Sequence, residues 1–96
     1  MPEYTFTLFV AGGSELGDRA VANFDRFVRA RLEGKCSLTI VDILKDTRSA
    51  RAHRVIATPM LVRDQPLPVI KILGDLSQEA KLLNQLGLND SPVAQG

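Results

Sequence analysis

Few residues of this chain have a type and spacing suited to catalysis, metal ligation or cofactor binding. Cys36 is the only cysteine and His53 the only histidine. No cysteine or acidic residue stands at ligand spacing from His53, so metal ligation has no supporting cluster and a solvated histidine is the preferred interpretation. Ser14 has no evident base to activate it, and Gly12-Gly13 does not complete a phosphate-binding glycine pattern. The sequence therefore predicts no catalytic residue, no metal and no cofactor.

Length and composition indicate one ordinary domain spanning residues 1–96. Hydrophobic residues make up 45% and charged residues 24% of the chain, as in soluble domains. The formal charge of +1 excludes strong overall attraction to nucleic acid or membranes. No apolar run approaches the roughly 18 residues of a membrane span. The N-terminus lacks a signal-peptide layout, so a cytoplasmic protein is expected.

The elements that must position any functional residue follow from the hydrophobic pattern. Alternating apolar residues predict strands over residues 4–10 and 37–44. Helical spacing predicts a helix over about 18–32, with Asp18 at its N-cap or in its first turn. A crossover of this length between two strands implies that they are parallel and joined right-handedly. Residues 4–44 are therefore predicted to form a βαβ unit.

The second half is predicted to place an antiparallel hairpin between two helices. A short helix over about 48–55 is expected to turn Ala52, Val55 and Ile56 inward. Strands over 60–63 and 69–73 are close enough to pair. A last helix follows from residue 77 to about 86, and residues 89–96 are expected to form a flexible tail, with order expected over 4–88. The order βαβαββα is the thioredoxin-like arrangement of an α/β domain.

The two ends of the hairpin carry turn residues. Proline has no N–H, so a strand begins after Pro59, and both a plain turn and a cis proline fit Thr58-Pro59. Gly74 samples φ > 0 freely. Asp75 and Ser77 are placed to accept N–H groups at the start of the last helix. A Ser77→Ala change is accordingly expected to weaken that helix by about 1 kcal/mol.

Dithiol exchange of the thioredoxin kind is excluded. Thioredoxins carry Cys-x-x-Cys in the loop after the first strand, where the helix dipole lowers the thiol pKa. The corresponding loop here, Ala11 to Glu15, contains no cysteine. Cys36 stands at the start of the second predicted strand, where a buried structural thiol is the favoured interpretation. A lone cysteine forms no internal disulfide, in keeping with a cytoplasmic location.

One segment, residues 45–63, is locally basic. Its five basic residues stand against a single acidic residue, for a formal charge of +4. They are Lys45, Arg48, Arg51, Arg54 and Arg63. A solvated helix face and a surface that meets an acidic partner both fit this pattern. Nucleic acid is the less favoured partner, because no aromatic residue is interleaved for base stacking.

Five short motifs together resemble the KaiB family of bacterial clock proteins. Leu8-Phe9-Val10-Ala11-Gly12 is similar to the family's Leu-Tyr-Val-Ala-Gly, and Val41-Asp42-Ile43-Leu44-Lys45 to its Ile-Asp-Val-Leu-Lys. Three further motifs match its second half at the same spacings: Ile56-Ala57-Thr58-Pro59, Pro66-Leu67-Pro68 and Ile72-Leu73-Gly74-Asp75-Leu76-Ser77. The resemblance covers about residues 4–88. Departures include Ile70, which replaces the first residue of an Arg-Arg pair, and Arg51-Ala52-His53-Arg54, which replaces a more acidic stretch.

The resemblance implies a non-enzymatic partner of the ring ATPase KaiC. Such a protein binds the N-terminal KaiC ring, competes with the kinase SasA and, in cyanobacteria, helps to sequester KaiA. The family also implies fold switching between a thioredoxin-like monomer and a tetrameric ground state of order βαββααβ. By position, Arg19, Lys45, Arg63 and Lys71 stand where the family has basic residues involved in binding. Local signals in the second half favour the thioredoxin-like form, so a monomer-leaning protein is expected, with self-association to a dimer or tetramer as the alternative.

Two functions from other classes stay open. One is a thioredoxin-like redox or glutathione-binding protein that lacks Cys-x-x-Cys, against which the loop Ala11 to Glu15 argues. The other is a nucleic-acid-binding module that uses the basic segment, and steep salt dependence of binding would identify it.

Overall fold

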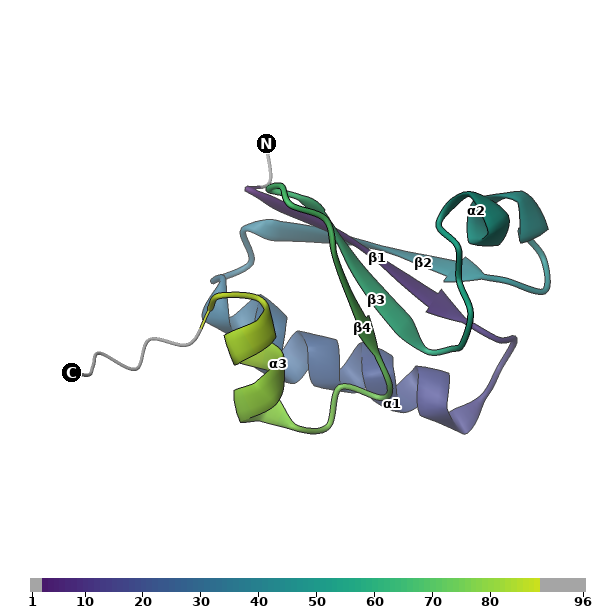
Figure 1. Cartoon of the computed structure of the whole chain (residues 1–96). Helices are drawn as coiled ribbons and strands as arrows, with labels where there is room; N and C mark the ends of the chain where they lie inside the picture. The colour runs from purple at the N-terminus through teal and green to yellow at the C-terminus, as the bar shows by residue number, and fades with distance from the viewer. Residues whose placement is uncertain (1–2, 89–96) are drawn as a thin grey trace.

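A computed structural model describes residues 3–88 and has the predicted thioredoxin-like element order rather than βαββααβ. The predicted tail, 89–96, lies outside the described residues. The four strands form one sheet in the order β2-β1-β3-β4 (Figure 1). β1 and β2 are parallel, whereas β3 is antiparallel to both β1 and β4. The predicted βαβ unit and hairpin are therefore confirmed. The strands are β1 (Tyr4–Val10), β2 (Cys36–Asp42), β3 (Met60–Gln65) and β4 (Ile70–Leu73).

The long crossover helix starts earlier than predicted and changes type midway. α1 (Glu15–Asn23) passes directly into η1, a π-helical segment (Phe24–Arg29). Ser14 is the N-cap, and its Oγ accepts a hydrogen bond from the Gly17 N–H at 3.0 Å. Asp18 is therefore a first-turn acid rather than the cap, where it complements the helix dipole.

Two short helices complete the fold. α2 (Thr47–Ala52) follows β2, and α3 (Glu79–Gln85) follows β4. Figure 1 shows α1 and α3 on the same side of the sheet and α2 at the other side, near the end where β2 finishes. Among residues 3–88, no helix is long and apolar enough to cross a membrane.

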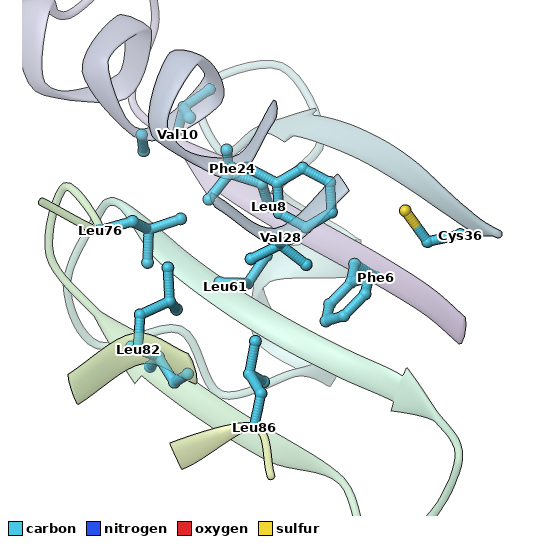
Figure 2. Close-up of a cluster of buried hydrophobic side chains, with 12 residues drawn as sticks. Phe6, Leu8, Val10, Phe24, Val28, Cys36, Leu61, Leu76, Leu82 and Leu86 are labelled. Atoms are coloured by element: carbon cyan, nitrogen blue, oxygen red, sulfur yellow. The ribbon is translucent and has the colours of Figure 1, made fainter. Parts of the chain in front are cut away.

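Alternate strand residues build a core on each face of the sheet. The larger cluster fills the space between the sheet, the crossover helix and α3 (Figure 2). Within it the rings of Phe6 and Phe24 meet edge to face, with their centroids 5.1 Å apart. The smaller cluster on the opposite face consists of Phe9, Met60 and Val62, with Val41, Ile43 and Val55 packed against it. The smaller cluster is thus the one beneath α2.

The inward face predicted for α2 is wrong. Ala52 is exposed and Ile56 is 85% exposed, and only Val55 packs against the sheet. The reason is that the helix ends three residues earlier than predicted. Arg54 then has a φ of 55°, so helical periodicity no longer decides which of the following side chains face inward.

The start of α3 also differs from the prediction. Gln78 occupies the N-cap position, and no side chain caps this helix. Ser77 is not the cap, because the buried Leu76 takes a φ of 64° and turns the chain before the helix begins. The Ser77 N–H instead donates to Asp75 Oδ1 at 3.1 Å. Asp75, rather than Ser77, is therefore the side chain that stabilises this turn.

We expect Asp75→Ala to lower the free energy of unfolding by about 1 kcal/mol, the usual value of one hydrogen bond. Ser77→Ala serves as the matched control, and its effect should stay within about 0.5 kcal/mol because its side chain caps nothing. Urea denaturation of the two variants measures both values. A larger loss for Ser77→Ala than for Asp75→Ala would contradict this assignment.

Candidate functional site

Basic residues surround α2. The helix begins at an N-cap aspartate, Asp46, whose Oδ1 accepts from the Ser49 N–H at 2.9 Å. Four cations lie before, on and after the helix, and all four are exposed. Among residues 3–88 none of them forms an ion pair with a carboxylate. Together they are the α2 basic face, defined as Lys45, Arg48, Arg51 and Arg54.

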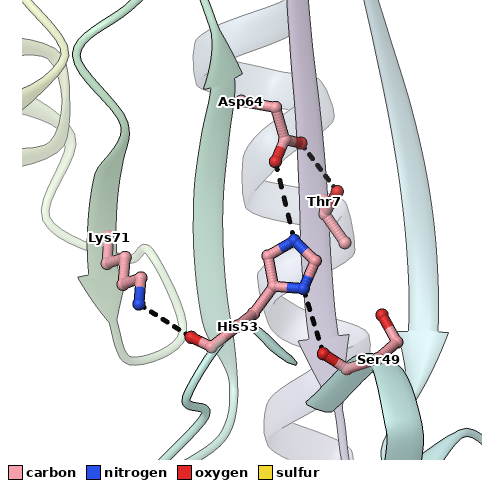
Figure 3. A network of polar contacts seen from close by, with 5 residues as sticks. All are labelled: Thr7, Ser49, His53, Asp64 and Lys71. Atoms are coloured by element: carbon pink, nitrogen blue, oxygen red, sulfur yellow. Dashed lines mark hydrogen bonds and ion pairs between the residues drawn. The ribbon is translucent and has the colours of Figure 1, made fainter. Parts of the chain in front are cut away.

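His53 holds this helix to the sheet. No residue of α2 itself is buried. The His53 ring packs on Phe9, with centroids 5.0 Å apart. Its Nδ1 lies 3.0 Å from the Ser49 carbonyl oxygen, an acceptor, so this nitrogen donates. Its Nε2 lies 3.9 Å from Asp64 Oδ1, and its own carbonyl accepts from Lys71 Nζ at 2.7 Å (Figure 3).

The prediction of a solvated histidine is therefore wrong. The His53 side chain is only 35% exposed, and an acidic residue does stand beside it. Asp64 comes from β3, where the pairing with β1 passes from Gln65 directly to Arg63. This bulge leaves Asp64 as the extra residue and turns its carboxylate to the α2 side, where Oδ2 accepts from Thr7 Oγ1 at 2.7 Å. His53 and Asp64 are eleven positions apart in the sequence, and a strand bulge brings them together. No sequence pattern therefore predicted their contact.

The structure brings only part of the predicted binding set together. Lys45 stands just before Asp46, the N-cap of α2, and Lys71 on β4 donates to the carbonyl of His53, its C-cap. Arg19 lies on α1, on the other side of the sheet (Figure 1). There its Nη2 pairs with Glu15 Oε2 at 3.1 Å, an exposed pair of small energetic value. Arg19 is therefore not part of the surface around α2.

Arg63 is not a surface residue in this fold. The residue is 7% exposed, on the face that packs against α3. Nη1 donates to the Leu86 carbonyl at 3.2 Å and Nη2 to the Pro68 carbonyl at 2.9 Å, while Nε has no partner among the described residues. In this fold the Arg63 guanidinium is not displayed to a partner, because it joins the end of α3 to the β3–β4 turn.

The predicted turn residues at the two ends of the hairpin lie next to each other. The Thr58–Pro59 bond is cis, and Pro59 is buried. The N–H of Gly74, whose φ is 108°, donates to the Pro59 carbonyl at 2.9 Å. The entry to β3 and the exit from β4 are therefore one joined segment at the same end of the sheet.

The thiol has the environment of a structural residue. Cys36 is buried, as predicted. Burial raises the pKa of its thiol, and the nearby Arg29 guanidinium, with Nη1 4.0 Å from Sγ, offsets this only in part. A raised pKa keeps the group as the unreactive thiol at neutral pH. Among residues 3–88, no three His, Cys, Asp or Glu side chains are grouped to hold a metal ion.

Solved structures with the same fold come from two groups. The N-terminal domain of Synechococcus elongatus SasA matches with a TM-score of 0.71 at 18% identity, covering 97% of this chain and 91% of that domain. Mitochondrial thioredoxin 3 of Saccharomyces cerevisiae matches with a TM-score of 0.69 at 17% identity, covering 95% and 81%. At such identities the likeness shows the fold alone, which is thioredoxin-like.

Sequence comparisons give the family. The circadian clock oscillator protein KaiB of Synechococcus elongatus is 35% identical over 85 residues, which span 88% of this chain and 83% of the relative. The KaiB of Acaryochloris marina is 32% identical over 93 residues, spanning 97% and 89%. A family model described as the KaiB domain matches residues 7–88. With the thioredoxin-like fold and the motifs from Leu8 to Ser77 in place, this chain belongs to the KaiB family of circadian clock proteins.

Proposed function

We propose that this protein is a non-enzymatic timing regulator that binds the N-terminal ring of a KaiC-type ATPase through the α2 basic face and Lys71. The observation that carries the proposal is the exposure of four cations, without an ion pair within residues 3–88, on and beside a helix that contributes no buried residue. Charges that form no ion pair within residues 3–88 are available to an acidic partner surface. Family membership supports a clock ATPase as that partner.

The likeness to the SasA domain supports a second part of the proposal. A sensor domain of the same fold would present its elements to the ATPase in a similar way, so the two would compete for one surface. Sequestration of a KaiA-type protein belongs to the same proposal as a consequence of that binding. The proposed location is the cytoplasm, where such an ATPase would be met.

Exchange with a second fold is also part of the proposal. The last two elements of the second half are short: β4 has four residues, and α3 has seven. Three consecutive turn positions, Gly74 to Leu76, include two residues with positive φ. A glycine there keeps both conformations open, while Leu76 is a position of local strain.

Binding to the ATPase tests the proposal. We expect the double change Arg48→Glu and Arg51→Glu to weaken binding of a KaiC-type ring at least tenfold, about 1.4 kcal/mol, because both charges reverse at the contact. Lys81→Glu on α3 is the control, since Lys81 is exposed away from α2. Titration by fluorescence anisotropy at two salt concentrations gives the affinities.

Two results would count against the proposal. Failure of the unchanged protein to bind any KaiC-type ring would remove it. Equal loss of affinity for the Lys81→Glu control would show that the contact is not on α2. Binding to RNA or DNA with a steep salt slope would instead support the nucleic-acid function of the same basic face.

A further inference from the structure

α2 is short and lies on the surface of the fold. The helix has six residues, none of them buried, and isolated helices shorter than about 12–15 residues are marginal in water. After the helix, Val55 packs against the smaller core cluster, and Lys71 Nζ donates to the His53 carbonyl. The His53 ring adds a further contact, because it packs on Phe9 and faces Asp64. The attachment of α2 to the sheet therefore depends on side chains at its C-terminal end.

Hydrogen bonds orient the His53 ring and the Asp64 carboxylate toward each other (Figure 3). Nδ1 of the ring donates to the Ser49 carbonyl at 3.0 Å, which leaves Nε2 as the nitrogen that faces Asp64 Oδ1. On the carboxylate, Oδ2 accepts from Thr7 Oγ1 at 2.7 Å. The β1 side chains at this contact, Phe9 and Thr7, carry no charge. The protonation of Nε2 therefore decides whether the contact is favourable.

A proton on Nε2 turns a repulsive contact into an attractive one. When His53 is neutral and Nδ1 donates, Nε2 is an acceptor, so it and the carboxylate oxygen present lone pairs to each other. When His53 is protonated, Nε2–H becomes a donor, and the separation of 3.9 Å holds an ion pair. Histidine exchanges this proton between about pH 5 and 8. Attachment of α2 is therefore favoured as the pH falls through that range, and the advantage is lost as the pH rises.

Other charged groups near the ring oppose its protonation. Lys71 on β4 binds the His53 carbonyl, and Arg51 and Arg54 are close to His53 along the chain. All three cations are exposed, so salt screens their effect on the ring. The Asp64 side chain is only 34% exposed and lies directly opposite Nε2, where screening is weaker. The carboxylate therefore outweighs the cations.

We propose that Asp64 is a positioning residue for the α2 basic face and acts through protonated His53, so that partner binding strengthens as the pH falls from about 8 to about 6. This role rests on the proposed function and regulates the same surface. With His53 protonated, α2 stays on the sheet and its cations keep one arrangement, which lowers the ordering cost of binding. With His53 neutral, α2 opens more often, and binding must order it.

Hydrogen exchange tests the attachment of α2 in the protein alone. The His53 and Val55 amides donate to the Ser49 and Ala50 carbonyls, so their exchange reports opening of this end of the helix. Comparison of the unchanged protein with Asp64→Asn at one pH cancels the intrinsic pH dependence of exchange. At about pH 6 we expect about threefold faster exchange in Asp64→Asn, in the range for a partly exposed ion pair. At about pH 8 it should exchange no faster than the unchanged protein. Equal exchange at the lower pH would overturn the proposal.

A double-mutant cycle shows whether Asp64 acts through His53. His53→Gln keeps a polar side chain but takes up no proton. In the His53→Gln background, Asp64→Asn should leave exchange of the Val55 amide unchanged at both pH values. The same acceleration with and without His53 would show that Asp64 supports α2 in another way, and it would overturn the proposed role.

Binding of a KaiC-type ring tests the consequence for the partner. The ratio of two affinities measured at one pH cancels the titration of the ring itself. We expect Asp64→Asn to bind about threefold more weakly than the unchanged protein at about pH 6 and equally at about pH 8. Glu79→Gln is the matched control, because it removes the same charge from an exposed position on α3, and it should bind like the unchanged protein.

The sign of the effect separates positioning from simple charge. Loss of a carboxylate beside a basic face would by charge alone strengthen binding to an acidic partner. Tighter or equal binding of Asp64→Asn at about pH 6 would therefore overturn the positioning role. Failure of the unchanged protein to bind the ring would remove the proposed function and the positioning role with it. The exchange ratio would still show whether His53 and Asp64 attach α2 in a pH-dependent way.

Discussion

Replacing Phe9 by alanine is expected to lower the free energy of unfolding by about 3–5 kcal/mol, the range for truncating a buried phenylalanine. Phe9 is fully buried at the centre of the smaller core cluster. It is also the ring on which His53 packs. The change therefore removes core volume and the support of α2 at the same time. Against a typical total stability of about 5–15 kcal/mol, such a loss leaves a marginal fold.

A milder matched pair separates the two effects. Phe9→Leu and Phe24→Leu each replace a fully buried ring by a smaller aliphatic side chain, on opposite faces of the sheet. Both should cost about 1 kcal/mol in urea denaturation. Only Phe9→Leu should speed hydrogen exchange of the His53 and Val55 amides, which donate to the Ser49 and Ala50 carbonyls. Equal exchange rates in both variants would show that Phe9 does not support α2.

Replacing Arg63 by methionine is expected to lower the free energy of unfolding by about 2 kcal/mol. The change leaves the buried Leu86 carbonyl without its donor, and an unpaired buried acceptor costs about 1–3 kcal/mol. The Pro68 carbonyl also loses a donor, but Pro68 is exposed and its carbonyl can bond to water instead. Relief of a buried cation whose Nε has no partner offsets part of this loss. The cation also lies at the C-terminal end of α3, where it complements the helix dipole.

The effect of Arg63→Met should concentrate in α3. Urea denaturation measures the global loss, and hydrogen exchange of the Leu86 and Leu88 amides, which donate to Leu82 and Leu83, reports the end of the helix. Arg63→Lys keeps the charge and can reach one carbonyl, so it should lose about half as much. A loss below about 0.5 kcal/mol for Arg63→Met would contradict a structural role and favour Arg63 as a binding residue.

The sheet followed from the sequence because its causes are local. Alternation in residues 4–10 and the β-branched run near residue 40 fix which residues face the core. The crossover length between them fixes parallel pairing. The burial of Cys36 was predicted from its residue type and its distance from the redox loop of thioredoxins, and it is confirmed. The length of α2 did not, because a turn with positive φ at Arg54 is selected by its surroundings rather than by the residue itself.

The candidate site was only partly predictable. The cations of the α2 basic face were visible as a charged segment, and Lys71 through resemblance to the family. The contact of His53 with Asp64 depends on the β3 bulge, which no local preference signals. Arg63 was predicted to be exposed because arginine usually is. In the structure it is buried and donates hydrogen bonds to two carbonyls from different segments.

The absence of buried residues in α2 has a consequence for how this protein can diverge. Substitutions at positions such as Arg48 and Arg51 do not disturb the core, so lineages can exchange one sign of charge for another there without loss of folding. Arg51 and Arg54 are exposed positions of this kind, whereas His53 between them packs on Phe9 and is constrained by the core. A change in the charge that meets a partner can therefore arise on this helix without any change in the sheet or the crossover helix.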